Sequence, residues 1–174
     1  MRGRRNEFEA FVRRAVKQGA NALMRQRGFK RPGGGWTFYR AVGGADAVAL
    51  MQELEVSATW RRGEEVGALT LHRRVLLRAL GSVQAPEHGF PVDVDGDAGD
   101  LAVSIHHWLR EEGLPWFDAP LDFEALARDA ELNHRGFQHR DAMNRCAALW
   151  ALAGRPDEVA RVQGLIAPEE EPPF

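Results

Sequence analysis

The acidic run "DVDGDAGD" is the stretch of the sequence that looks most like a metal site. Calcium loops of the EF-hand type present oxygen ligands at alternate positions, and Asp93, Asp95 and Asp97 fit the first, third and fifth of these positions. The match then fails, because Ser104 stands where the loop needs a bidentate glutamate. We therefore predict a solvated acidic loop that leads into a helix, with no metal bound.

The histidines, the serines and the single cysteine form no recognisable catalytic pattern. His106 and His107 are adjacent on an expected helix, so their side chains diverge by about 100°, whereas zinc-binding pairs on helices are three or four residues apart. Cys146 falls on the apolar stripe of another expected helix, which is typical of a buried core residue. None of the serines lies in a G-x-S-x-G motif. The sequence thus predicts no catalytic residue, metal site or cofactor, and an enzyme whose site is assembled from distant residues stays an alternative.

The glycine-rich stretch "GFKRPGGGWTFYR", residues 28–40, raises the question of a phosphate site. A Walker loop needs glycines that lead into a lysine and a helix, so that backbone N–H groups point at the phosphate. Here the order is reversed, because Lys30 and Arg31 precede the glycines and a segment of strand composition follows them. The stretch is therefore predicted to connect a helix to a strand, with a phosphate-binding role as the alternative.

A helix is expected before this connection. Asn6, with Glu9 three residues later, predicts a capping box at its start. Gly28 follows basic residues and occupies the usual position of the left-handed residue that closes a helix. An apolar stripe at helical spacing is expected to pack against a sheet, and its members are Phe8, Phe11, Val12, Val16 and Leu23.

Three antiparallel strands are predicted to follow, in "WTFYRAV", "AVALMQELEVSATW" and "VGALTLHRRVLL". Apolar residues alternate along the second and third segments, which predicts a sheet with one covered face and one polar face. Gln52 and Arg73 interrupt the apolar face. Thr70, His72 and Arg74 fall on the other face.

The rest of the chain is predicted to be a loop followed by helices. Asp100 and Asp122 are expected to cap the first two helices, the first of which ends at Gly113, and Gly154 and Pro156 to separate the last two. The predicted fold class is α+β, with an antiparallel sheet of at least three strands packed by an N-terminal helix and followed by about four helices. One domain is expected over residues 1–174. Its parts are a helix and sheet (1–80), a loop (81–99), helices (100–167) and a disordered acidic tail (168–174).

The N-terminal half resembles a bacterial family of uncharacterised proteins, domain-of-unknown-function family 4304. The residues that carry the resemblance are Gly28, Phe29, Thr37, Phe38, Tyr39 and Arg40. The tryptophan pair expected further along appears as the single Trp116. The resemblance implies an α+β fold in a bacterial protein, and it supplies no catalytic residue.

Size and composition favour a soluble cytoplasmic protein. A chain of 174 residues can bury a core without a metal or a disulfide, and the single cysteine fits a reducing compartment. No apolar run approaches the roughly 20 residues that span a bilayer, so no membrane contact is expected.

Charge is distributed unevenly along the chain. Residues 1–40 carry a net charge of +9, whereas residues 79–174 carry −11. Such asymmetry can mark a nucleic-acid surface, and Arg13, Arg14 and Lys17 would then contact phosphates. We favour instead the packing of basic against acidic segments, because the chain contains no nucleic-acid motif.

One group of residues could form a binding face on the sheet. It comprises Trp36, Tyr39, Trp60, His72 and Arg74, since aromatic side chains and an arginine can stack on a base or grip a peptide. We favour the alternative that Trp36 and Trp60 pack beneath the first helix, because large aromatic side chains dominate protein cores. We predict a non-enzymatic module that binds another protein, with nucleic-acid association through the basic N-terminal region as the main alternative.

Overall fold

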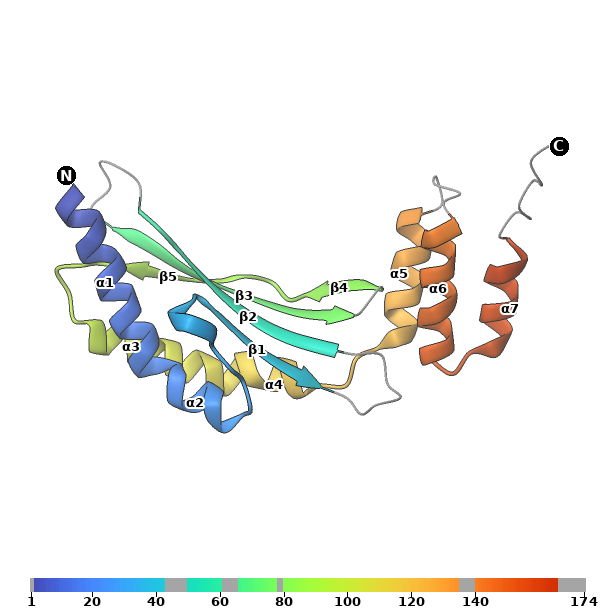
Figure 1. Ribbon diagram of the computed structural model, residues 1–174, viewed down its shortest axis with the longest axis horizontal. Coiled ribbons are helices and arrows are strands. Elements are labelled where there is room, and N and C mark those ends of the chain that lie inside the picture. The colour runs from blue at the N-terminus through green and yellow to red at the C-terminus, as the bar shows by residue number, and fades with distance from the viewer. Residues whose placement is uncertain (1, 43–49, 61–65, 78–79, 135–139, 166–174) are drawn as a thin grey trace. The chain divides into compact units, whose positions relative to one another are not determined.

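The computed structural model describes residues 2–42, 50–60, 66–77, 80–134 and 140–165. It divides into two compact units, here called the first unit (Met1–Ala119) and the second unit (Pro120–Phe174). Figure 1 shows a sheet with helices in the first unit and helices alone in the second. The expectation of one domain over residues 1–174 stays a prediction. The acidic tail, residues 168–174, lies outside the described residues.

The first unit contains a five-stranded antiparallel sheet. The strands are β1 (Thr37–Val42), β2 (Leu50–Thr59), β3 (Gly67–Leu77), β4 (Gly81–Gln84) and β5 (His88–Val92). Both β4 and β5 pair with β3, on the side that β2 does not occupy. The three predicted strands and the α+β fold are confirmed.

The prediction of a loop over residues 81–99 is wrong, because β4 and β5 lie within it. Both strands are short, and β5 contains Gly89 and Pro91, residues that local sequence patterns associate with turns. Their pairing with β3 is a long-range interaction, and no periodicity within four or five residues can reveal it.

One face of the sheet is covered and the other is open within the first unit. Along β3, every second residue from Gly67 to Leu77 is buried, as the alternation predicts. Gln52 and Arg73 belong to this covered face, and only 7% and 8% of their surfaces are exposed. Figure 1 shows the helices of the first unit gathered on one side of the sheet.

The helices of the first unit come from two stretches of chain. They are α1 (Arg2–Gly19), α2 (Asn21–Gln26), a 3₁₀ turn (Pro32–Gly34), α3 (Ala98–Trp108), a π-helical turn (Leu109–Gly113) and α4 (Leu114–Asp118). Within α1, Phe8, Val12 and Val16 are buried, and Phe11 and Leu23 of the predicted stripe are partly exposed. Helix α1 packs extensively on α3, and the Phe8 ring reaches Gly67 and Trp60 of the sheet end.

Three predicted helix boundaries in this unit are wrong. Helix α1 begins at Arg2, so Asn6 lies inside it and does not cap it. Asp97, not Asp100, caps α3, because the Asp97 carboxylate accepts a hydrogen bond from the Gly99 N–H (2.8 Å). The predicted helix end at Gly113 is wrong because α3 ends at Trp108 and the helical path continues through the π-helical turn into α4.

The close of α2 agrees with the prediction. Gly28 has a φ of 81°, and its N–H donates to the Arg25 carbonyl (3.0 Å). The Phe29 N–H reaches back to the Met24 carbonyl (2.9 Å), which completes a Schellman motif. The chain therefore turns back along α2, and Phe29 is buried.

The second unit contains three helices: α5 (Phe123–His134), α6 (Arg140–Leu152) and α7 (Pro156–Gly164). Asp122 caps α5 as predicted, with its carboxylate 2.9 Å from the Ala125 N–H. Gly154 has a φ of 70° and closes α6, and Pro156 opens α7. Cys146 is fully buried, as its place on the apolar stripe predicts. No helix among the described residues has the length and apolar character needed to cross a bilayer.

Candidate functional site

A cationic pocket of about 540 Å³ lies between α1, α2 and the start of β1. Arg13 and Lys17 are four residues apart and so project from the same side of α1. Arg25 comes from α2, and the Schellman turn at Gly28 returns Lys30 and Arg31 to the same cavity. We call these five side chains the pocket cations: Arg13, Lys17, Arg25, Lys30 and Arg31. Three neighbouring segments of the chain thus deliver positive charge to one cavity.

The apolar part of the pocket comes from two phenylalanines. Phe29 and Phe38 both line the cavity, and only 2% and 1% of their surfaces are exposed. Phe29 follows the turn that closes α2, and its ring lies 5.2 Å from that of Phe117. Phe38 belongs to β1, opposite Leu54 of β2. Both rings are fixed in the core, so this part of the pocket is preformed.

Arg31 is held in place by three contacts within the first unit. Its Nη1 donates to the Asn21 side-chain oxygen (3.0 Å), and its Nε donates to the Gly35 carbonyl. The guanidinium lies 5.2 Å above the Phe38 ring. Burial, and to a smaller extent the charge of Arg13, lowers the pKa of Arg31. An arginine stays protonated in proteins, so the lowered pKa indicates that holding this cation here is electrostatically unfavourable.

The glycine-rich stretch contributes to the pocket through a carbonyl group. Pro32–Gly34 form one 3₁₀ turn, in which Gly33 has a φ of 52°. The turn places the Gly35 carbonyl against Arg31. The glycines therefore orient an arginine, and the predicted role as a helix-to-strand connection fits their position.

Charge in the pocket is of one sign. None of the described residues that line it is acidic. No ion pair joins Lys17, Arg25 or Lys30 to a carboxylate in the described part of the chain. Arg13 additionally lies 4.7 Å from the centre of the Trp36 ring. The site can therefore attract an anion, and its apolar wall strengthens such an interaction by excluding water.

Two of the three residues of the nucleic-acid alternative belong to this pocket. Arg13 and Lys17 line it, whereas Arg14 is exposed and does not. The sequence did not predict that three further residues would contact a ligand: Arg25, Lys30 and Arg31. The available signal was the group of basic residues on both sides of Gly28, together with the expected reversal of the chain there.

The structure divides the predicted binding face between two sides of the sheet. Trp36 and Trp60 lie on the covered side, against Arg13 and Phe8 of α1 respectively. Tyr39, His72 and Arg74 lie on the open side. The tryptophans are therefore not part of one surface with the other three residues.

The open side carries two polar clusters. In the first, Arg74 Nη2 donates to Glu53 (2.7 Å) and Glu55 (3.0 Å) of the adjacent strand. The hydrogen bond to Glu53 is the main cause of a raised Arg74 pKa. These charges satisfy one another across β2 and β3, so the first cluster stabilises the sheet.

In the second cluster, His72 lies between Ser57 and Glu87. Its Nε2 is 2.9 Å from the Ser57 Oγ, and its Nδ1 is 3.1 Å from a Glu87 carboxylate oxygen. Serine, histidine and a carboxylate in this order are the components of a hydrolase triad. A triad also requires donors aimed at the developing oxyanion, and Ser57 lies within β2 on an open sheet face. Sequence reasoning missed this cluster because its members come from three separate segments.

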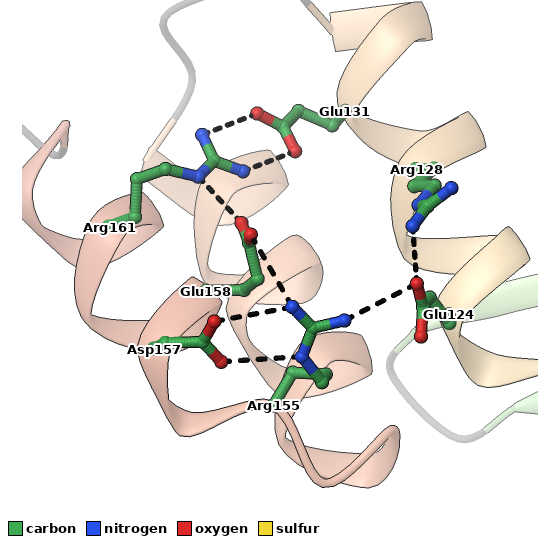
Figure 2. Close-up of polar contacts among 7 residues, drawn as sticks. All are labelled: Glu124, Arg128, Glu131, Arg155, Asp157, Glu158 and Arg161. Carbon is green, nitrogen blue, oxygen red and sulfur yellow. Dashed lines mark hydrogen bonds and ion pairs between the residues drawn. The ribbon is translucent and has the colours of Figure 1, made fainter.

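The second unit has a network of ion pairs between α5 and α7 (Figure 2). Arg161 donates to both carboxylate oxygens of Glu131 (2.8 and 2.7 Å) and also to Glu158 (2.6 Å). Arg155 bridges Asp157 (3.2 Å) and Glu124 (3.4 Å). Each of these charges has a partner of opposite sign, so the network is suited to joining helices.

The single cysteine and the acidic loop are two further candidates for chemistry. Cys146 is buried, and burial is the main reason why its pKa is raised, so the thiol is a poor nucleophile. Among the described residues, no group of three or more histidines, cysteines or acids is arranged to hold a metal ion. The Asp93 carboxylate accepts a hydrogen bond from the Asp95 N–H (2.9 Å) within its own loop.

Comparison with known proteins adds no further assignment. No protein-family model, curated protein or solved structure matches the chain. The resemblance to family 4304 stays a prediction.

Proposed function

We propose that the protein is a non-enzymatic interaction module that binds an anionic segment of a partner protein in the cationic pocket. The supporting observation is the convergence of five cations on one cavity that has no acidic lining residue among those described. The proposed location is the bacterial cytoplasm. Its support is the single cysteine and the family resemblance of residues 28–40.

The electrostatic cost of the pocket favours a binding role. Like charges on neighbouring elements repel, and burial of Arg31 adds to that cost. The side chains of Lys17 and Lys30 are exposed, so they contribute little to the packing of the first unit. An anionic ligand offsets the repulsion, and complementary charge also speeds association and selects the partner.

A protein partner fits the pocket better than nucleic acid does. Proteins that bind single strands present aromatic rings on which successive bases stack. Here Phe29 and Phe38 are buried, and Arg13 lies over the Trp36 ring. The cations surround one concave cavity, whereas a nucleic-acid backbone needs an extended track of charge.

A peptide titration tests the proposal. We expect a fluorescein-labelled hexaglutamate peptide to bind in a fluorescence anisotropy assay, and the hexaglutamine peptide of equal length not to bind. Replacing Lys17 and Lys30 by Gln should weaken binding roughly tenfold, since each lost cation–carboxylate contact at a partly exposed site contributes about 0.7 kcal/mol.

The matched control changes two exposed arginines of α1 outside the pocket, Arg4→Gln and Arg14→Gln. It removes the same net charge and should leave the affinity within about twofold. Equal losses in the two double variants would show that binding follows net charge and not the pocket, and would refute the proposal. Absence of binding by the wild-type protein would also refute it.

A further inference from the structure

We infer that the group bound by the cationic pocket is a phosphate monoester on a phosphorylated side chain of the partner. The inference rests on the proposed function and names the chemistry of its ligand. Five cations surround about 540 Å³, a space that accepts one or two side chains of a partner and not a row of them.

A phosphate group suits this charge density better than a carboxylate does. A carboxylate has one negative charge and two acceptor oxygens. A phosphorylated side chain carries a charge of about −1.5 to −2 at pH 7 and three strong acceptor oxygens. One such group could therefore receive donors from α1, from α2 and from the segment after Gly28 at the same time.

Arg31 is positioned for this role before any ligand binds. The Asn21 oxygen, the Gly35 carbonyl and the Phe38 ring hold its guanidinium in place. Nη2 is the one nitrogen of this guanidinium without a hydrogen bond to the described residues. Fixing the side chain in advance removes the entropy cost that a flexible arginine pays on binding, and arginine clusters are a recurring means of phosphate recognition.

The apolar wall strengthens the same interaction. Phe29 and Phe38 exclude water from one side of the cavity, and opposite charges attract more strongly where the dielectric is low. Arg31 is partly buried over the Phe38 ring, so water screens its charge less than the charges of the exposed pocket cations. Lys17, Arg25 and Lys30 are exposed and can adjust their ammonium or guanidinium groups to the remaining oxygens.

The experiment uses three labelled peptides that are identical except for a central serine, glutamate or phosphoserine, placed between short runs of glutamate. We expect the phosphoserine peptide to bind at least tenfold more tightly than the glutamate peptide at pH 7.5, and the serine peptide to bind most weakly. Between pH 5.0 and 7.5 the phosphoserine peptide should gain affinity, because its second ionisation lies near pH 6. The glutamate peptide should change little, because its carboxylates ionise near pH 4.3.

Variants assign the effect to the pocket without depending on one fragile substitution. Arg31→Lys keeps the charge but loses the planar fork, and should reduce the preference for phosphoserine over glutamate by at least fivefold. Because Arg31 is partly buried, the exposed pair Lys17→Gln and Lys30→Gln provides a second test, with circular dichroism to verify folding. Arg4→Gln with Arg14→Gln is again the control and should keep the full preference.

The outcomes separate the two proposals. Equal binding of the phosphoserine and glutamate peptides would overturn the inference and leave the proposed function in place. Absence of binding by every peptide would overturn the proposed function, and the inference with it. Inorganic phosphate should compete with the phosphoserine peptide. Tight binding of inorganic phosphate without binding of any peptide would overturn the assignment of a protein-borne phosphate.

Discussion

Gln52 and Arg73 show what a polar residue in the covered face of a sheet can contribute. Gln52 accepts a hydrogen bond from Arg40 Nε (2.7 Å) and donates one to the Phe117 carbonyl (2.6 Å). Arg73 donates to the carbonyls of Glu112 (3.1 Å) and Pro86 (3.3 Å). Both residues therefore satisfy carbonyls of irregular or short segments that lie against the sheet.

Arg73 also makes contact with two aromatic rings. Its guanidinium lies 4.9 Å from the centre of the Trp108 ring and 5.4 Å from that of Trp116. Burial lowers its pKa, and its Nε is buried without a partner among the described residues. The side chain is thus a structural cation. The free-energy cost of removing its charge from water is offset by contacts with the two rings and by hydrogen bonds to two carbonyls.

We predict that Arg73→Ala lowers the free energy of unfolding by about 2–4 kcal/mol, since it leaves two carbonyls unsatisfied and a cavity between two tryptophans. Arg73→Met fills most of that volume without a charge and should cost about half as much. Urea denaturation measures both. A loss below 0.5 kcal/mol for Arg73→Ala would contradict the structural role assigned to this residue.

Cys146 offers a second test at the scale of one residue. Its side chain is fully buried, and its pKa is raised, so little thiolate is present at pH 7.5. We expect a thiol reagent such as Ellman's to label the native protein at least about 100-fold more slowly than the urea-unfolded chain, because labelling requires local opening. Labelling at equal rates would show that α6 does not shield this residue.

At the scale of helices and strands, the close approach of two backbones limits which residue types can occupy the contact. A side chain at Gly19 would begin 2.3 Å from the Ala102 carbonyl oxygen of α3, a distance that real side chains do not adopt. Gly19 is therefore the residue that lets α1 lie directly on α3. Helix propensity alone would favour alanine at this position.

We predict that Gly19→Ala destabilises the protein by about 1–3 kcal/mol, as overpacking in a tight contact does. The matched control is Gly164→Ala at the end of α7, where no heavy atom outside the neighbouring residues and the backbone of the same helix lies within 4 Å of the added carbon. That change should be neutral or slightly stabilising. Thermal unfolding measures both, and similar shifts in Tm for the two variants would disprove the close packing of α1 on α3.

The elements that sequence patterns predicted correctly are those with strong local signals. The period-two pattern of β2 and β3 and the Gly154–Pro156 boundary could be read within ten or twelve residues. The two short strands could not, because they exist only beside β3. The predicted helix start at Asn6 is wrong for another reason. Its spacing to Glu9 fits a capping box, but the helix already begins at Arg2.

The candidate pocket was hidden from sequence for a related reason. Its cations lie between residues 13 and 31 of a basic segment, and only a reversal of the chain brings the two ends of that segment together. The Gly28 turn was predicted, but its direction relative to α1 depends on the burial of Phe29 in the core. Charge counts along the sequence therefore left open whether the basic segment packs against acidic segments or binds an anionic partner, and they could not locate a binding site.

At the scale of the whole molecule, the two kinds of anionic partner would contact different sets of basic residues. Nucleic acid would engage the exposed cations of α1 as well as the pocket, whereas the proposed peptide ligand engages the pocket alone. Each phosphate contact with duplex DNA contributes about 0.9 to the salt slope of the binding constant.

We predict no sub-micromolar binding to a 20-base-pair duplex at 150 mM salt, in an anisotropy titration repeated at several salt concentrations. If nucleic acid were the ligand, replacing Arg13, Arg14 and Lys17 together would flatten the salt slope by about three units, provided that each makes one phosphate contact. Tight, salt-sensitive binding of this kind would replace the peptide proposal with the nucleic-acid alternative.

The backbone bridge between Lys30 and Tyr39 has a consequence for how another chain can approach. Lys30 exchanges two backbone hydrogen bonds with Tyr39 (2.8 and 2.9 Å). This bridge occupies the middle of the outer edge of β1. The opposite edge of the sheet is shared by two strands of four and five residues, and Pro91 in one of them has no N–H to donate. Within the described strands, neither edge offers a long, unpaired row of backbone groups, so a partner cannot readily extend this sheet by adding a strand of its own. Recognition must then be carried by side chains, and edge-to-edge aggregation of copies of this unit is disfavoured by the same bridge.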